Sequence, residues 1–211
     1  TIKGSDTKEQ EFGSFELDNA NGALLLSDIN VNNFTLSQGV MDLDIYNLYV
    51  SGSLLTSGTY SSTLMYKTAG NAGDGGISLY VNGTGTYLFP IGTDANAVTR
   101  YTPAWVDVET YSDDGYIRMS VADGDLPTAL SPGGNVLSYY WRVRHADFTT
   151  QPTVHFTFLS DEYDDPTTGG GDKDDISIPS AVVGEVLNED PYVRSMVDGS
   201  VNESNIGGTT V

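Results

Sequence analysis

The sequence contains no cysteine in its 211 residues. Disulfide bonds, thiolate metal sites and cysteine nucleophiles are therefore excluded. The absence does not argue against an extracellular location, because a chain of this length can bury a sizeable hydrophobic core without covalent cross-links.

Basic residues are scarce: 9 Lys and Arg stand against 29 Asp and Glu, which gives a formal net charge of −20. Contacts with phosphate groups need Lys and Arg, so the composition argues against binding to nucleic acid or to an anionic membrane surface. Such acidity favours solubility in salty surroundings or the binding of cations.

The sequence also lacks an apolar run of 18 residues, a signal peptide and a convincing amphipathic helix, so no segment is predicted to span a membrane. It begins with Thr1 rather than Met, which suggests a processed form or a fragment of a longer protein. What it has instead is 24 Gly and 13 Tyr with abundant Thr, Ser, Val and Asn. This composition is typical of β-strands joined by many turns and predicts an all-β fold.

The predicted strands differ in length and pattern between the two parts of the chain. After a polar lead-in at residues 1–11, residues 12–93 hold short apolar segments punctuated by Asn, Asp and Gly, which favour a β-solenoid-like part, although an ordinary sandwich of short strands is the alternative. The apolar positions Ile29, Val31, Phe34 and Leu36 are predicted to point inward.

Residues 94–200 hold longer segments with period-two alternation, which predict an antiparallel β-sandwich. In the segment 139–146, the even-numbered residues Tyr140, Arg142 and Arg144 share one face and the odd-numbered residues the other. Residues 201–211 are predicted to be a tail or a linker to a following module.

The segment TYLFPIGTDANAVTRYTPAWVDV (residues 86–108) lies where the short predicted strands end and the longer ones begin. Phe89 and Ile91 are predicted core anchors, and Pro90 belongs at a strand edge or bulge. The segment does not have the several glycines and following helix of a phosphate-binding loop, so it is interpreted as a junction.

Four segments carry a family resemblance: NNFTLSQGVMDLDIYNLYVSGSL, GTGTYLFPIGT, YTPAWVDV and YYWRVRHADFTTQPTVHFTFLSDEYD. Their order and spacing, over roughly residues 20–165, resemble a β-rich module repeated in very long secreted proteins of Bacteroidetes. Those proteins are associated with the type IX secretion system, and some are gliding-motility or surface adhesins. The sorting domain typical of such substrates is not in this sequence, so the secretion route rests on the resemblance.

The resemblance implies a non-catalytic structural or adhesion module at the bacterial cell surface. Its partners would be neighbouring modules of the same long polypeptide, or like subunits, and surface glycans. The sequence has no catalytic motif that would contradict a non-catalytic role. His145 and His155 lie in alternating segments, and there is no nucleophile elbow, HExxH motif or zinc-ligand spacing. With 29 acids, a chance pair of carboxylates carries no information about glycoside hydrolysis. We expect the protein not to be an enzyme.

Calcium is the one cofactor that the sequence suggests. Hard cations take six to eight oxygen ligands, and one stretch of 15 residues, DEYDDPTTGGGDKDD, is dense in carboxylates, although it does not fit the EF-hand loop. The alternative is a solvated acidic linker. The candidate ligands are Asp161, Glu162, Asp164, Asp165, Asp172, Asp174 and Asp175.

A carbohydrate-binding module attached to a larger enzyme or adhesin is the alternative function. Aromatic rings on the face of a β-sandwich stack on pyranose rings. The candidates for such a platform are Tyr101, Trp105, Tyr139, Tyr140 and Trp141. Alternation must turn one of Tyr140 and Trp141 inward, and the position of Trp141 beside Val143 favours a core tryptophan.

Overall fold

The computed structural model describes residues 11–70, 75–94, 97–123, 139–149, 153–158, 183–187, 192–196 and 204–205, with side chains for those between 12 and 149. These residues form β-strands joined by turns and loops, which confirms the all-β prediction. Within this part of the chain there is no helix of the length and apolarity needed to cross a membrane.

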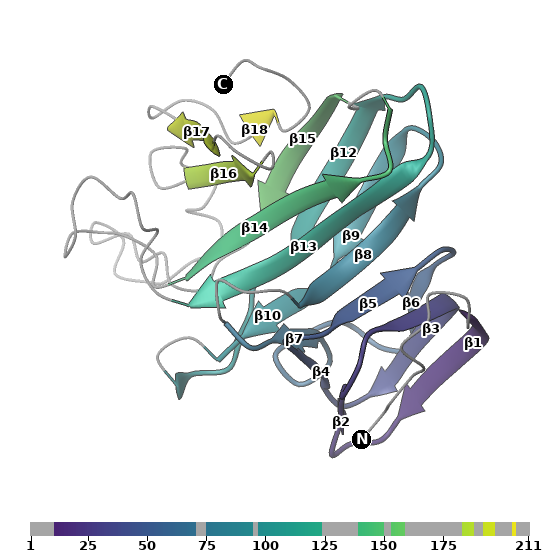
Figure 1. The fold of residues 1–211 in the computed structure, drawn as a ribbon. Helices are drawn as coiled ribbons and strands as arrows, with labels where there is room; N and C mark the ends of the chain where they lie inside the picture. Colours follow the sequence, from purple (N-terminus) through teal and green to yellow (C-terminus); the bar gives the residue numbers. More distant parts are fainter. Residues whose placement is uncertain are drawn as a thin grey trace.

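The large sheet begins with parallel strands and continues with antiparallel ones (Figure 1). Parallel pairing joins β1 (Glu11–Asp18), β3 (Ile29–Gln38), β5 (Asn47–Val50) and β8 (Gly76–Val81), and β6 (Leu54–Thr56) also pairs with β3. Antiparallel pairing then adds β13 (Gly115–Asp123) and β14 (Tyr139–Ala146), and the sheet ends with β16 (Val183–Leu187) and β17 (Tyr192–Met196).

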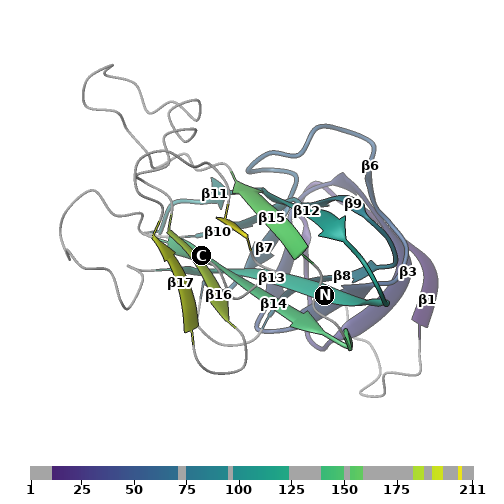
Figure 2. The ribbon, with the colours of Figure 1, turned by 90° about the horizontal axis from the view of Figure 1, so that it is seen from above.

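Two smaller sheets complete the architecture. The five-stranded sheet joins β2 (Ala23–Leu24), β4 (Met41–Asp44), β7 (Tyr66–Thr68) and β10 (Ile91–Thr93) in parallel, with β11 (Arg100–Tyr101) antiparallel at its edge. The four-stranded sheet joins β9 (Gly85–Phe89), β12 (Ala104–Thr110), β15 (Thr153–Phe158) and β18 (Ser204–Asn205) in antiparallel fashion. Figures 1 and 2 show β8, β13 and β14 in one layer and β9, β12 and β15 in the layer that faces it.

One hydrophobic core fills the space between the sheets, because alternate residues of each strand turn inward. Ile29, Val31, Phe34 and Leu36 are at most 2% exposed, as their spacing predicts. Phe34 also packs between Phe15 and Tyr66, with ring centroids 5.1 and 5.4 Å apart.

The strand β3 changes its alternation at Asn32 and Asn33. Before this step it pairs with β5, and after it with β6. The backbone amides of the following turn are bound here: Gly52 donates to the Asn32 carbonyl and Ser53 to Asn33 Oδ1. The two asparagines therefore allow β3 to pair with β5 in its first half and with β6 in its second half, while its apolar side chains point inward in both halves.

The junction segment runs through β9, β10, β11 and β12. Phe89 and Ile91 are fully buried, which confirms the predicted core anchors. Pro90 lies where the chain passes from the four-stranded to the five-stranded sheet, and its carbonyl accepts a hydrogen bond of 3.0 Å from the Tyr66 amide. Gly92 is required because a Cβ there would overlap the Arg100 carbonyl and the Met65 side chain.

Candidate functional site: a groove on the outer face of the large sheet

The outer face of the large sheet carries a row of polar and aromatic residues at paired positions. Asn30 lies opposite Tyr49, Tyr49 opposite Ser78, Ser78 opposite Arg118, and Arg118 opposite Arg144. The residues that flank Asn30, Tyr49, Ser78 and Arg118 along their strands belong to the hydrophobic core, as does Val143 before Arg144. The row therefore crosses five strands on the face opposite the core.

A groove of about 260 Å³ lies along this row. We call it the arginine groove, and its lining includes Asn30, Tyr49, Ser78, Tyr116, Arg118 and Arg144. Strands β3, β5, β8, β13 and β14 place these side chains, and their backbones are fixed by the sheet ladder beneath (Figure 1). The site is thus built on rigid strands rather than on loops.

A short relay orients Arg118. Its Nη1 atom donates a hydrogen bond of 3.0 Å to Oδ1 of Asn47. Asn47 in turn donates to the two carboxylate oxygens of Asp28, from its backbone amide at 2.8 Å and from Nδ2 at 3.2 Å. A guanidinium has five N–H donors, so this contact fixes the orientation of Arg118 and leaves other donors directed elsewhere.

Tyrosine rings form one wall of the groove. The rings of Tyr49 and Tyr116 meet edge to face with centroids 6.1 Å apart, and Tyr80 lies 5.3 Å from Tyr116. The hydroxyls of Tyr80 and Tyr111 both donate to Asp114. The hydrogen bonds from the two tyrosines hold the pKa of Asp114 below its usual value, and the bond to Asp114 raises the pKa of Tyr111 to about 12.

Positive charge is concentrated on this face. Arg118, Arg142 and Arg144 are three of the nine basic residues in the whole sequence, and they lie on two neighbouring strands. Arg118 and Arg144 lie directly opposite each other in the ladder, so two positive charges are neighbours across the strands.

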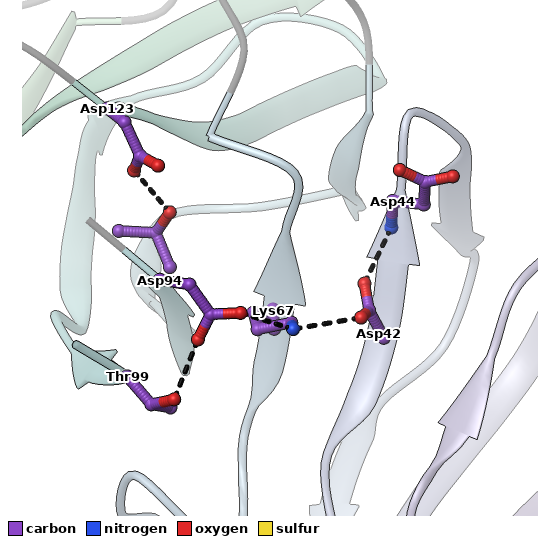
Figure 3. Close-up of polar contacts among 7 residues, drawn as sticks. Asp42, Asp44, Lys67, Asp94, Thr99 and Asp123 are labelled. Atoms are coloured by element: carbon purple, nitrogen blue, oxygen red, sulfur yellow. Dashed lines mark hydrogen bonds and ion pairs between the residues drawn. The ribbon is translucent and has the colours of Figure 1, made fainter. Parts of the chain in front are cut away.

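A second polar cluster lies on the five-stranded sheet (Figure 3). The Lys67 ammonium lies 2.9 Å from Asp42 and 2.6 Å from Asp94, while Thr99 also donates to Asp94. Nearby, Thr93 donates to Asp123 at 2.6 Å. The lysine holds the ends of β4, β7 and β10 together.

The Lys67 cluster has the properties of a structural ion pair. Burial lowers the pKa of Lys67, but hydrogen bonds with Asp94 and Asp42 outweigh this effect and hold it above its usual value. The amine therefore stays protonated and is not a nucleophile. Among the residues with described side chains, no three His, Asp or Glu are grouped so that they could hold a metal ion.

The predicted calcium ligands Asp161, Glu162, Asp164, Asp165, Asp172, Asp174 and Asp175 all lie outside the described residues. The calcium hypothesis therefore stays a prediction. Of the two histidines, His145 is half-buried at the end of β14 and lines the arginine groove, whereas His155 is described only by its backbone in β15.

The proposed aromatic platform is not a single surface. Tyr139 and Trp141 are 1% and 4% exposed, and Trp141 Nε1 donates to the Thr102 carbonyl at 2.9 Å. Both residues belong to the core, which corrects their inclusion as stacking candidates and agrees with the alternation that turned Trp141 inward. Trp105 and Tyr140 are half-buried on two different sheets.

Tyr101 is half-buried on β11, and burial raises its pKa. Glycan stacking at Tyr101, Trp105 or Tyr140 remains a prediction for separate positions.

The residues of the arginine groove are not among the candidates that the sequence suggested. One signal was available: alternation puts Arg142 and Arg144 together on one outer face of a chain that has few bases. Tyr49, Ser78 and Arg118 gave no such signal, because only the strand register brings them to Arg144.

Comparisons with protein-family models, curated proteins and solved structures gave no significant match to this chain.

Proposed function

We propose that this chain is a non-catalytic structural or adhesion module of a large secreted cell-surface protein. The observation that carries the proposal is the continuous large sheet, in which β8 pairs in parallel with β5 and in antiparallel fashion with β13. One ladder and one core thus extend from the N-terminal strands to β14. Such a scaffold is suited to linking neighbours and to presenting an outer face.

The finer architecture belongs to the same proposal. Residues 12–93 form a short β-solenoid-like part and residues 94–200 an antiparallel β-sandwich. Support for the first part comes from the parallel register, in which Glu11, Asn30 and Tyr49 follow one another at equal spacing along the chain. Support for the second comes from the antiparallel pairs of β12, β13 and β14.

The location and route follow from the resemblance to modules of type IX secretion substrates in Bacteroidetes. The protein acts outside the cell, in surface attachment, motility or extracellular assembly. Its partners are neighbouring modules of the same polypeptide or like subunits. The net charge of −20 supports a role in an exposed, salt-rich setting.

The experiment is removal of the segment 12–200 from the parent protein in the source cells. We expect normal amounts of secreted protein and a loss of attachment to surfaces, while antibodies against this chain label intact wild-type cells. Unchanged attachment, or labelling only after the cells are broken, would contradict the proposal.

The second candidate is a carbohydrate-binding module attached to a larger enzyme or adhesin. The arginine groove favours it, because tyrosine rings and hydrogen-bonding groups lie together on one rigid face. The two candidate functions differ in the partner that the chain contacts: a neighbouring module or subunit in the first, and a carbohydrate in the second. Identifying the ligand of the groove distinguishes them.

A further inference from the structure

The arginine groove lies on a positively charged face of a protein that is strongly negative overall. Three arginines share one sheet face in a protein of net charge −20, and two of them are cross-strand neighbours. Fields of one sign inside a cleft attract ligands of the opposite sign and orient them on approach. Arg118 and Arg144 line the groove with one carboxylate, Asp147, so the charges of the lining favour an anionic ligand.

The remaining lining narrows the ligand to a sugar. The ring of Tyr49 packs edge to face on Tyr116, so these two residues offer apolar ring surface. Asn30 and Ser51 add neutral groups that donate and accept hydrogen bonds. Ring faces beside such groups suit a pyranose, which has apolar C–H faces and hydroxyls around its edge.

We propose that the arginine groove binds a carboxylate-bearing sugar, a hexuronate residue within an anionic glycan. The carboxylate lies between Arg118 and Arg144, and the sugar ring lies against the tyrosines. This inference rests on the proposed attachment function, since it names the ligand that an attachment module would hold.

The size of the groove agrees with this ligand. Its volume of about 260 Å³ is just below the lower limit of typical small-molecule sites, about 300 Å³. A single sugar unit with its carboxylate suits such a space, with the rest of the glycan passing outside it. Binding is therefore weak for each unit and becomes firm only through repetition along a surface.

The arrangement of Arg118 favours bidentate recognition of a carboxylate. Its contact with Asn47, which is held by Asp28, fixes the guanidinium plane before a ligand arrives. A pre-oriented fork matches the two oxygens of a carboxylate at little entropic cost.

Asp147 sets the direction of the ligand. This residue lines the groove beyond the end of β14 and has a positive φ of 69°. Its carboxylate repels the acidic end of the sugar and accepts hydrogen bonds from hydroxyls. Asn tolerates the same left-handed backbone, so Asp147→Asn changes the charge without changing the fold.

The test is calorimetric titration of the whole chain with three probes: trigalacturonate, neutral galactotriose and a short oligomer of glutamate. We expect binding of trigalacturonate alone, weakened by added NaCl. Arg144→Gln and Arg118→Gln should each weaken it about tenfold or more, since a hydrogen bond to a charged group accounts for such a factor. Asp147→Asn should tighten it severalfold.

Arg100→Gln is the matched control, because Arg100 lies on β11 of the other sheet, and it should leave the affinity unchanged. Arg144→Lys keeps the charge without the fork and should give an intermediate affinity. Unchanged far-UV circular dichroism and melting temperature identify the variants that are folded.

Three results would overturn the proposal: no binding of trigalacturonate by the wild type, equal affinity for galactotriose, or equal affinity for oligoglutamate. The last would assign the groove to acidic peptides instead. If glycan binding fails while deletion of the segment still abolishes attachment, only the ligand is wrong and the attachment function stands.

Discussion

At the scale of single residues, the described polar side chains mostly serve to position one another. Lys67 is a clear case, because it lies between carboxylates from β4 and from the end of β10. Burial would raise the pKa of Asp94, but its hydrogen bonds with Lys67 and Thr99 hold it below the usual 3.8. The pKa of Lys67 lies above its usual 10.5. The ion pair therefore stabilises the fold fully between pH 3.8 and pH 10.5, the usual pKa values of the two groups. Its contribution is lost as the pH falls through the lowered pKa of Asp94 or rises through the raised pKa of Lys67.

Replacing Lys67 with Met tests this pairing. The side chains are partly exposed, so we expect a loss of about 1 kcal/mol in the free energy of unfolding near neutral pH. Urea denaturation at about pH 7 and about pH 2 measures it, and the loss should shrink as the pH falls through the lowered pKa of Asp94, because a protonated carboxyl no longer pairs with the ammonium. An equal loss at both pH values would show that Lys67 acts by packing instead.

The hydroxyls of the buried Tyr66 and the half-buried Tyr87 differ in their partners. Tyr66 is fully buried, and its hydroxyl has no hydrogen-bond partner in the described part of the chain, whereas Tyr87 donates to the Gly83 carbonyl at 3.1 Å. Tyr66→Phe should leave stability unchanged or raise it, and Tyr87→Phe should lower it by about 0.5–1.5 kcal/mol. Thermal unfolding of both variants checks this, and a larger loss at Tyr66 would reveal an unseen partner.

At the scale of strands, the sequence predicts faces better than it predicts neighbours. Alternation correctly separates core residues from outer residues over 139–144, because period two follows from the geometry of any strand, but it fails at His145, which is half-buried and lines the groove. It does not predict that Ser78 pairs with both Tyr49 and Arg118, since nothing local specifies which strands meet. The candidate site is a product of this register, and it was missed for that reason.

The turn between β3 and β4 depends on Gly39. Its φ is +82°, and a Cβ there would overlap the Asn19 carbonyl and the Gly22 amide. We expect Gly39→Ala to cost about 1–3 kcal/mol. Gly13→Ala is the control, because nothing lies within 4 Å of its added Cβ, and the two midpoints of urea unfolding should differ clearly. Similar midpoints would mean that the turn can relax.

At the scale of the whole molecule, composition predicts the fold class but not the site. The scarcity of Lys and Arg argued against partners rich in phosphate, and it makes the clustering of Arg118, Arg142 and Arg144 informative. Excess negative charge also destabilises a compact state through self-repulsion. Cations should therefore stabilise this protein, either by screening or by specific binding.

A comparison of calcium with NaCl distinguishes specific cation binding from screening of the negative charge. If the predicted ligands in 161–175 hold Ca²⁺, calcium should raise the melting temperature well beyond NaCl at the same ionic strength, and a chelator should reverse the rise. Scanning calorimetry measures both. Equal melting temperatures in the two salts would end the calcium hypothesis and leave only screening.

The central claim is attachment through the arginine groove without chemical change to the ligand. Its most direct test is the retention, under flow, of beads coated with this chain on a surface of polygalacturonate. We predict that wild-type beads are retained, that Arg118→Gln/Arg144→Gln beads are washed away, and that the polymer keeps its length. Equal retention of both kinds of bead, or a shortened polymer, would contradict the account.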